Sequence, residues 1–402
     1  MRRIDANTLN ALSGSRSGEG ITVFVWYGSR LAYPGPLPVA SWGFSWDRTR
    51  QIQTFDMTVA DKEGRLAPWL LEDPLGVGGS RLQVRYNVGG AGSINIGWYR
   101  ITGAAPAERW HSYRIDDAGR VNADSSVPAG KKDVLISGGA TIQIQADDLG
   151  AMIAADRLLA PESPQGTNPT VVGEIRRLAG DIVPVVTSPG VVDRPVNKTL
   201  IYERERLDAI QSLCKSVACD YRMNGDGQLE IYPLAAQAPV ATLQGGPEGL
   251  LVRVDREQKY DGLFNRFVVT GTGTDTPVRA ISEITAGPLS VNGPHGRVPT
   301  FYESNMISTQ TQAYDYSRTM KDTLLAGLTV ELKVTCLPVP HVQQGDWVQV
   351  GNPVAGGQPF ILAGMVKAIN QPSNGTVPGP CTVTVECSYS DVQIALGGVD
   401  RG

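Results

Sequence analysis

The sequence predicts a mainly β fold with an α/β segment in its middle. Hydrophobic residues recur with period two in both halves of the chain, and with helical spacing only between them. Gly and Pro are abundant, with 46 and 27 among 402 residues, as is usual where many short strands are joined by tight turns. A chain of this length has room for two or three domains.

The first predicted domain is a β-barrel over residues 20–148. It follows a polar, Ser- and Gly-rich stretch at residues 1–19, which we expect to be a flexible arm. Short alternating strands at this spacing are typical of a closed barrel or a sandwich. The expected strands are Ile21–Tyr27, Ile52–Val59, Arg81–Tyr86, Gly97–Ile101, Val134–Ser137 and Thr141–Gln145. The polar residues 120–132 predict a surface loop.

Helical spacing replaces alternation over residues 149–244, which predicts an α/β insertion domain. The third of its helices leads into a hairpin, because a glycine-rich turn separates two short apolar runs. That turn is Asn224-Gly225-Asp226-Gly227. The helices are expected after a cap at Asp147-Asp148, over Thr170–Ala179 and over Glu203–Val217.

Alternation returns over residues 245–396, the second predicted β-barrel domain, and residues 397–402 form a short tail. One helix, over Tyr314–Leu325, is expected within this domain. The expected strands are Leu250–Val254, Asn265–Thr270, Leu328–Val334, Asp346–Val350, Phe360–Val366 and Cys381–Cys387.

Charge and cysteine content exclude several classes of protein. The net charge of −4 is spread along the chain without the basic stripe that binding to nucleic acid requires, although a mildly acidic surface suits a conduit for DNA. The five cysteines form no C-x-x-C pair and indicate a reducing site of synthesis, such as a bacterial cytoplasm. We expect neither a signal peptide nor a membrane-spanning segment, because no apolar stretch follows the N-terminus.

No catalytic, cofactor-binding or metal-binding residue is assigned from the sequence. The three histidines, His111, His295 and His341, lie in expected loops without a second ligand at helical spacing, so they are interpreted as surface residues. Phosphate-loop and nucleophile-elbow motifs are absent. The turn at Asn224–Gly227 lacks the spacing of a calcium loop, and Gly271-Thr272-Gly273 is interpreted as a hairpin loop.

Two groups of residues keep a carbohydrate-related function open. The acidic pairs Asp116-Asp117 and Asp147-Asp148 have the chemistry of glycan cleavage, but solvation and helix capping explain them equally well. Five tryptophans of the first domain suggest a sugar-stacking surface, although aromatic residues on alternating strands more often belong to a core. These are Trp42, Trp46, Trp69, Trp98 and Trp110.

From about Asp147 onward the order of elements resembles the hub proteins of phage tail tips and contractile-tail baseplates. The residues that carry the resemblance are Glu205–Ile210, Asp226–Leu229, Tyr260–Gly271 and Leu337–Val348. It extends over residues 20–395, with the first domain matched by topology alone. The resemblance implies two barrels related to the tail-tube fold in each chain, so that three chains present six barrels to a sixfold tube.

The resemblance therefore implies a structural virion protein rather than an enzyme: a homotrimeric tail-tip hub, without cofactor, at the distal end of the tail. Its implied partners are the tail tube or distal tail protein, the tape measure protein, and tail fibres or a spike. DNA would pass without sequence-specific binding during genome ejection. Many such hubs carry a C-terminal hydrolase, spike or receptor-binding domain, whereas this sequence stops shortly after its last strand, so lytic activity is expected on another protein.

Three alternatives remain open at this point. A distal tail ring protein would be hexameric rather than trimeric. A carbohydrate-binding receptor or glycan-cleaving tail protein would use the tryptophans. A hub of a related injection device would share the same sequence features, and neither the host nor the neighbouring tail proteins follow from the sequence.

Overall fold

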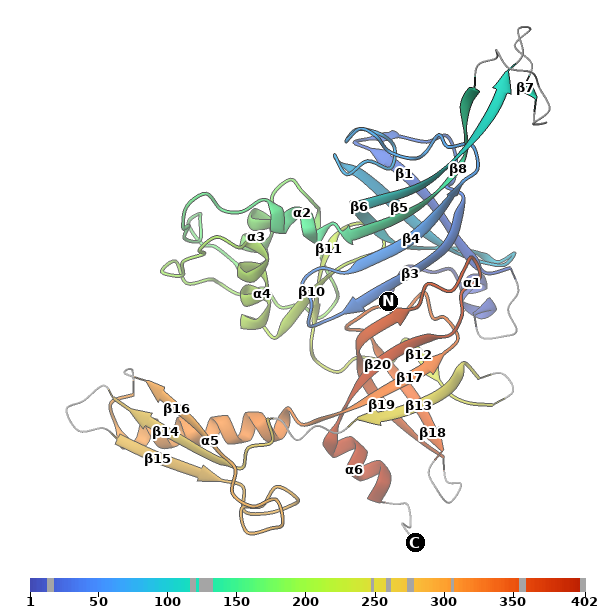
Figure 1. Ribbon diagram of the computed structural model, residues 1–402. Coiled ribbons are helices and arrows are strands. Elements are labelled where there is room, and N and C mark those ends of the chain that lie inside the picture. Colours follow the sequence, from blue (N-terminus) through green and yellow to red (C-terminus); the bar gives the residue numbers. More distant parts are fainter. Residues whose placement is uncertain are drawn as a thin grey trace. The chain divides into compact units, whose positions relative to one another are not determined.

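The computed structural model is mainly β with a helical middle segment, which confirms the predicted fold class (Figure 1). The chain forms two compact units, the first from Met1–Val254 and Lys333–Val385 and the second from Asp255–Leu332 and Glu386–Gly402. The structure describes residues 1–12, 18–115, 121–122, 133–246, 249–257, 262–272, 278–304, 307–353 and 359–397.

The first β-region has a strand at each range that alternation predicts, but Val134–Ser137 and Thr141–Gln145 belong to one strand, β8, and β3 was not predicted. In β5, for example, every second side chain is buried, from Ser80 to Val88. Strands β6 and β8 form a long antiparallel ribbon that extends well past the neighbouring strands (Figure 1). The strands are β1 Gly20–Tyr27, β2 Arg30–Leu31, β3 Val39–Asp47, β4 Thr54–Asp61, β5 Ser80–Val88, β6 Gly92–Ile115, β7 Val121–Asn122 and β8 Asp133–Asp148. The surface loop predicted over residues 120–132 lies, apart from β7, outside the described residues.

Residues 1–12 are folded, which corrects the prediction of a flexible arm over residues 1–19. Helix α1, Ala6–Ala11, begins after Asp5, whose side chain accepts a hydrogen bond from the Thr8 N–H. Leu12 and Arg2 are buried, with 1% and 5% of their surface exposed. Long-range contacts order this segment, and its polar composition gave no sign of them.

The middle segment is built on one helix pair and a small sheet. Helices α3 and α4 pack together through Ile175, Leu178, Ile210 and Leu213, all nearly inaccessible to solvent. The predicted hairpin is confirmed, since β10 and β11 pair antiparallel around the glycine-rich turn, and β9 adds a parallel strand. The elements are α2 Gly150–Ala155, α3 Val171–Ala179, β9 Val185–Thr187, α4 Arg206–Ser216, β10 Cys219–Met223 and β11 Leu229–Pro233.

The second β-region continues the sheet of the first. Strand β19 pairs antiparallel with β3, from Ala368 opposite Asp47 to Gln371 opposite Phe44. One sheet therefore runs through both regions in the order β13-β17-β20-β19-β3-β4-β8-β6-β5-β1-β2. Closure of each region into a separate barrel stays a prediction. The added strands are β12 Ala241–Leu243, β13 Leu251–Glu257, β17 Thr329–Cys336, β18 Trp347–Pro353, β19 Pro359–Gln371 and β20 Cys381–Ser388.

The second unit has a core of its own, which the alternation pattern did not separate from the predicted domain over residues 245–396. Its three strands form a sheet in the order β15-β14-β16, and Ala313 of α5 packs on Val269 and Ala280 of that sheet. The antiparallel pairing of β14 with β15 confirms the hairpin after Gly271. The elements are β14 Arg266–Gly271, β15 Val278–Glu283, β16 Pro299–Ser304, α5 Gln310–Ala326 and α6 Tyr389–Gly397.

The predicted helix at Tyr314–Leu325 is confirmed as α5, which starts four residues earlier. Thr309 accepts from the Gln312 N–H while the Gln312 side chain accepts from the Thr309 N–H, so a capping box sets this start.

No helix in the described part of the chain combines the length and apolarity that crossing a bilayer requires.

Candidate functional site

Arg222 on β10 is a buried cation, with 3% of its side chain exposed. Its Nε donates to Glu230 of β11 at 2.9 Å, and its Nη1 donates to Asp346 at 2.8 Å. Nη1 also donates to the carbonyl oxygen of Gln344 at 2.7 Å. One guanidinium group therefore ties the middle hairpin to the turn that precedes β18.

Asp346 is the shared acceptor of this cluster. Its Oδ1 also accepts from the Met1 nitrogen at 2.6 Å, and its Oδ2 accepts from the Gln343 N–H at 2.9 Å. Burial is the largest single influence on the pKa of Asp346 and would raise it, but the charges of Arg222 and the Met1 ammonium, with the hydrogen bonds that they donate, together hold this pKa below its usual value. The carboxylate is therefore ionised at neutral pH and pairs with Arg222.

Arg2 joins the N-terminal segment to both β-regions. Its Nε donates to the carbonyl oxygen of Ile96 at 3.2 Å, and its Nη1 donates to those of Pro340 and Val342 at 2.9 and 2.8 Å. The guanidinium carbon lies 4.2 Å from the ring centre of Trp46. Burial lowers the pKa of Arg2 to about 10, so the side chain is still a cation at neutral pH. We call Arg2, Arg222, Glu230 and Asp346 the junction cluster.

Asp148 is a buried carboxyl group at the end of β8, with 4% of its surface exposed. It accepts from the Gln53 N–H at 3.0 Å and from the Gly150 N–H at 2.9 Å. The second bond reaches the first residue of α2, but the N-cap position itself is Leu149, whose side chain forms no capping hydrogen bond, so the predicted cap at Asp147-Asp148 is displaced by one residue. Burial raises the pKa of Asp148 to about 7, with a smaller contribution from the neighbouring charge of Asp147.

We expect Asp148→Asn to gain stability relative to the wild type as the pH rises from about 4 to 7. The folded chain holds this proton up to a pKa of about 7, whereas an unfolded chain releases it near the ordinary value of about 4. Stability of the wild type therefore falls across this window, by on the order of 1 kcal/mol per pH unit from this group. Urea unfolding of both proteins at several pH values measures the difference, and a difference independent of pH would contradict the assignment.

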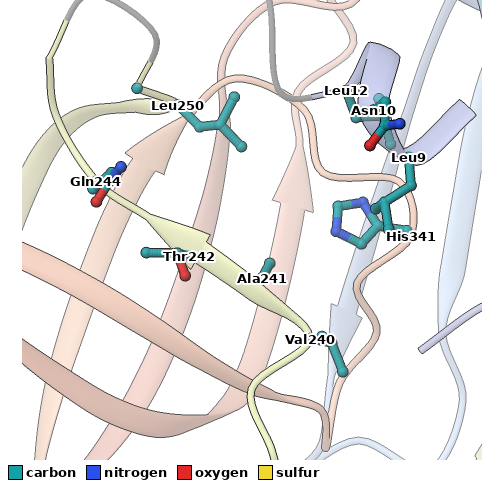
Figure 2. Close-up of a pocket in the computed structure, with 10 residues that line it drawn as sticks. Leu9, Asn10, Leu12, Val240, Ala241, Thr242, Gln244, Leu250 and His341 are labelled. Atoms are coloured by element: carbon teal, nitrogen blue, oxygen red, sulfur yellow. The ribbon is translucent and has the colours of Figure 1, made fainter. Parts of the chain in front are cut away.

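A cavity of about 330 Å³ lies beside α1. Figure 2 shows Leu9 and Asn10 of α1, Leu12 directly after it, and His341 on one side, and the segment from Val240 to Gln244 on the other. Among its described lining residues, His341 is the one titratable side chain. This composition suits the binding of an apolar group with one hydrogen-bonding atom, and it offers no paired acid and base.

The structure separates the three histidines. His111 is exposed on β6, His295 Nε2 lies 2.9 Å from the carbonyl oxygen of Leu263, and His341 is buried with 3% of its surface exposed. The expected loop position is therefore wrong for His111, which lies on β6. The expected surface position is wrong for His341, because the turn before β18 is packed inside the first unit. Among the described residues, no three His, Cys, Asp or Glu side chains are grouped as a metal site would require.

The five tryptophans divide into core and surface. Trp42 and Trp46 are buried, and the half-buried Trp98 packs on the core of the middle segment. Trp69 and Trp110 are exposed, by 81% and 53%. The core interpretation holds for the first three, so they form no sugar-stacking surface. Of the acidic pairs, Asp116-Asp117 lies outside the described residues.

Two solved structures share this fold over nearly their whole length. The tail protein of Neisseria meningitidis MC58 is 16% identical and superposes with a TM-score of 0.55, over 92% of this chain and 98% of that one. The 43 kDa tail protein of prophage MuSo2 from Shewanella oneidensis is 11% identical, with a TM-score of 0.54 over the same shares. The chain has the fold of a phage tail protein.

This fold extends beyond these two tail proteins. A chain of the Francisella PdpA–VgrG complex superposes with a TM-score of 0.54 and 8% identity, over 94% of this chain and 59% of that one. No protein-family model matches the sequence, and no curated protein matches it either. The sequence resemblance to tail-tip and baseplate hubs is thus confirmed at the level of the fold.

The residues of the junction cluster were not singled out from the sequence. Arg222 and Asp346 are 124 positions apart, and neither belongs to a motif of known spacing. One signal was present, because the strands that become β10 and β11 carry Asp220, Arg222 and Glu230 among apolar residues. A charged residue in such a strand indicates a buried partner, but not which one.

Proposed function

We propose that this chain is the trimeric hub of a phage tail tip and has a structural rather than a catalytic role. The observation that carries the proposal is the shared fold with two tail proteins over 98% of their length. The continuous sheet through both β-regions adds support, because a hub that presents two tube-like modules per chain needs them in a fixed relation.

In this role the hub closes or lines the distal end of the DNA channel and connects the tail tube or distal ring to fibres or a spike. The net charge of −4 suits passage of DNA without retention. The junction cluster would hold the middle segment against both β-regions while the tip is under load. Receptor engagement would then shift the tip from a closed to an open state.

Native mass spectrometry of the purified chain tests the assembly. We expect a species of three times the chain mass of 43.0 kDa. A hexamer would favour a distal tail ring instead, and a monomer at all concentrations would contradict the trimer. A glycan-binding role receives less support, because Trp42, Trp46 and Trp98 are packed in the interior.

A further inference from the structure

Three consecutive large apolar side chains are exposed on the loop between β4 and β5. Trp69, Leu70 and Leu71 expose 81%, 60% and 65% of their surface. Single exposed apolar residues are ordinary, but a contiguous group of this kind marks an interaction surface. We call Trp69–Leu71 the apolar tip of this loop.

The apolar tip is held in a defined shape. The Asp73 carboxylate accepts from the N–H groups of both Trp69 and Leu70, at 2.6 and 2.7 Å. The Gly78 N–H donates to the carbonyl oxygen of Leu71 at 2.8 Å, and the base of the loop is fixed by the fully buried Leu75. A rigid loop loses little conformational entropy on binding, so its exposed side chains are prepared for a partner.

The cavity beside α1 lies at the other end of the same strand β5. The loop joins β5 at Ser80, where the Ser80 hydroxyl donates to the carbonyl oxygen of Asp73. Helix α1 lies at the opposite end, since the Thr8 hydroxyl donates to the carbonyl oxygen of Ala91, just past Val88. The nine residues of β5, at about 3.3 Å each, separate the loop from α1. The apolar tip therefore cannot reach the cavity of its own chain.

The size and lining of the cavity suit an indole ring. A cavity of about 150 Å³ holds a benzene ring, and this one has about 330 Å³. Leu9, Leu12 and Val240 supply apolar surface, while the side-chain oxygens of Asn10 and Gln244 can accept from an indole N–H. Figure 2 shows these side chains on facing sides of the hollow.

We propose that Trp69 of one copy inserts into the cavity beside α1 of a neighbouring copy. Such a contact joins one surface of a copy to a different surface of the next copy. Contacts of this kind close into rings when the rotation between copies permits. The proposal rests on the proposed trimer, for which it names the contact that links one subunit to the next. A tryptophan in an apolar pocket is also the usual anchor of a protein interface.

A photocross-linking experiment locates the contact directly. The full-length variant Trp69→p-benzoylphenylalanine is mixed with isotopically labelled chain, irradiated and digested. We expect cross-links between copies to peptides that contain residues 6–12 or 240–250. The matched control is the same substitution at Leu159, which is fully exposed and far from the loop in sequence. Cross-links to other regions, or none between copies, would overturn the proposal.

A second variant separates this contact from the trimer itself. We expect Trp69→Ser to weaken association by roughly tenfold or more, and Leu159→Ser to leave it unchanged. A wild-type trimer that Trp69→Ser does not weaken would overturn the contact and leave the hub intact. The expected cross-link in an assembly that is not trimeric would support the contact and contradict the proposed hub.

Discussion

Replacing Arg222 with Ala is expected to destabilise the first unit by about 3–5 kcal/mol, because it leaves the carboxylates of Asp346 and Glu230 buried without their cation. The loss of the bond to the Gln344 carbonyl oxygen adds to this effect. Urea unfolding at fixed protein concentration and neutral pH measures the change. Tryptophan fluorescence is a suitable signal, because all seven tryptophans lie in the first unit.

The matched control is Arg157→Ala. Arg157 also pairs with a carboxylate, Glu205 at 3.1 Å, but its side chain is 66% exposed. Exposed pairs contribute about 0–1 kcal/mol, so this variant should unfold close to the wild type. If Arg222→Ala were no less stable than Arg157→Ala, the junction cluster would not hold the middle segment in place.

Replacing Trp46 with Ala is expected to cost about 3–5 kcal/mol, the usual range for a large aromatic residue removed from a core. Trp46 stacks on Phe44 with ring centres 3.7 Å apart, and its Nε1 donates to the Tyr99 hydroxyl at 3.2 Å. The substitution also removes the ring over which the Arg2 guanidinium lies. The same urea titration reports the loss.

Trp110→Ala is the control for this second prediction, because Trp110 is 53% exposed and takes no part in the contact proposed for Trp69. Its stability should lie within about 0.5 kcal/mol of the wild type. Equal effects of the two substitutions would contradict the division of the tryptophans into core and surface. The expected result also means that loss of glycan binding in a variant of Trp42 or Trp46 would report unfolding rather than a sugar site.

Local patterns in the sequence were sufficient to predict most strands and helices. The alternation in Arg81–Tyr86 and the apolar stripe of Glu203–Val217 reappear as β5 and α4, because each element buries one face along its own length. The exact limits of an element depend on particular contacts. Helix α4 starts at Arg206 rather than at the predicted Glu203, and the Arg206 Nη1 donates to the Leu178 carbonyl oxygen.

Features that depend on distant residues could not be predicted in this way. The pairing of β3 with β19 and the bond between Arg222 and Asp346 join residues more than one hundred positions apart, and no local period reports them. Trp46 and Trp69 likewise have the same chemistry, and only the packed fold shows that one is core and the other surface. The site residues therefore followed from the structure, whereas the hub-like fold followed from the order of elements.

A chain that forms the tip of a phage tail, as proposed, lies at one end of the intact particle. Immunogold labelling of particles with an antibody to the chain, scored by electron microscopy along the tail, locates it. We expect gold at the distal end of the tail. Gold on the tail shaft, on the capsid or on no particle would contradict the proposal.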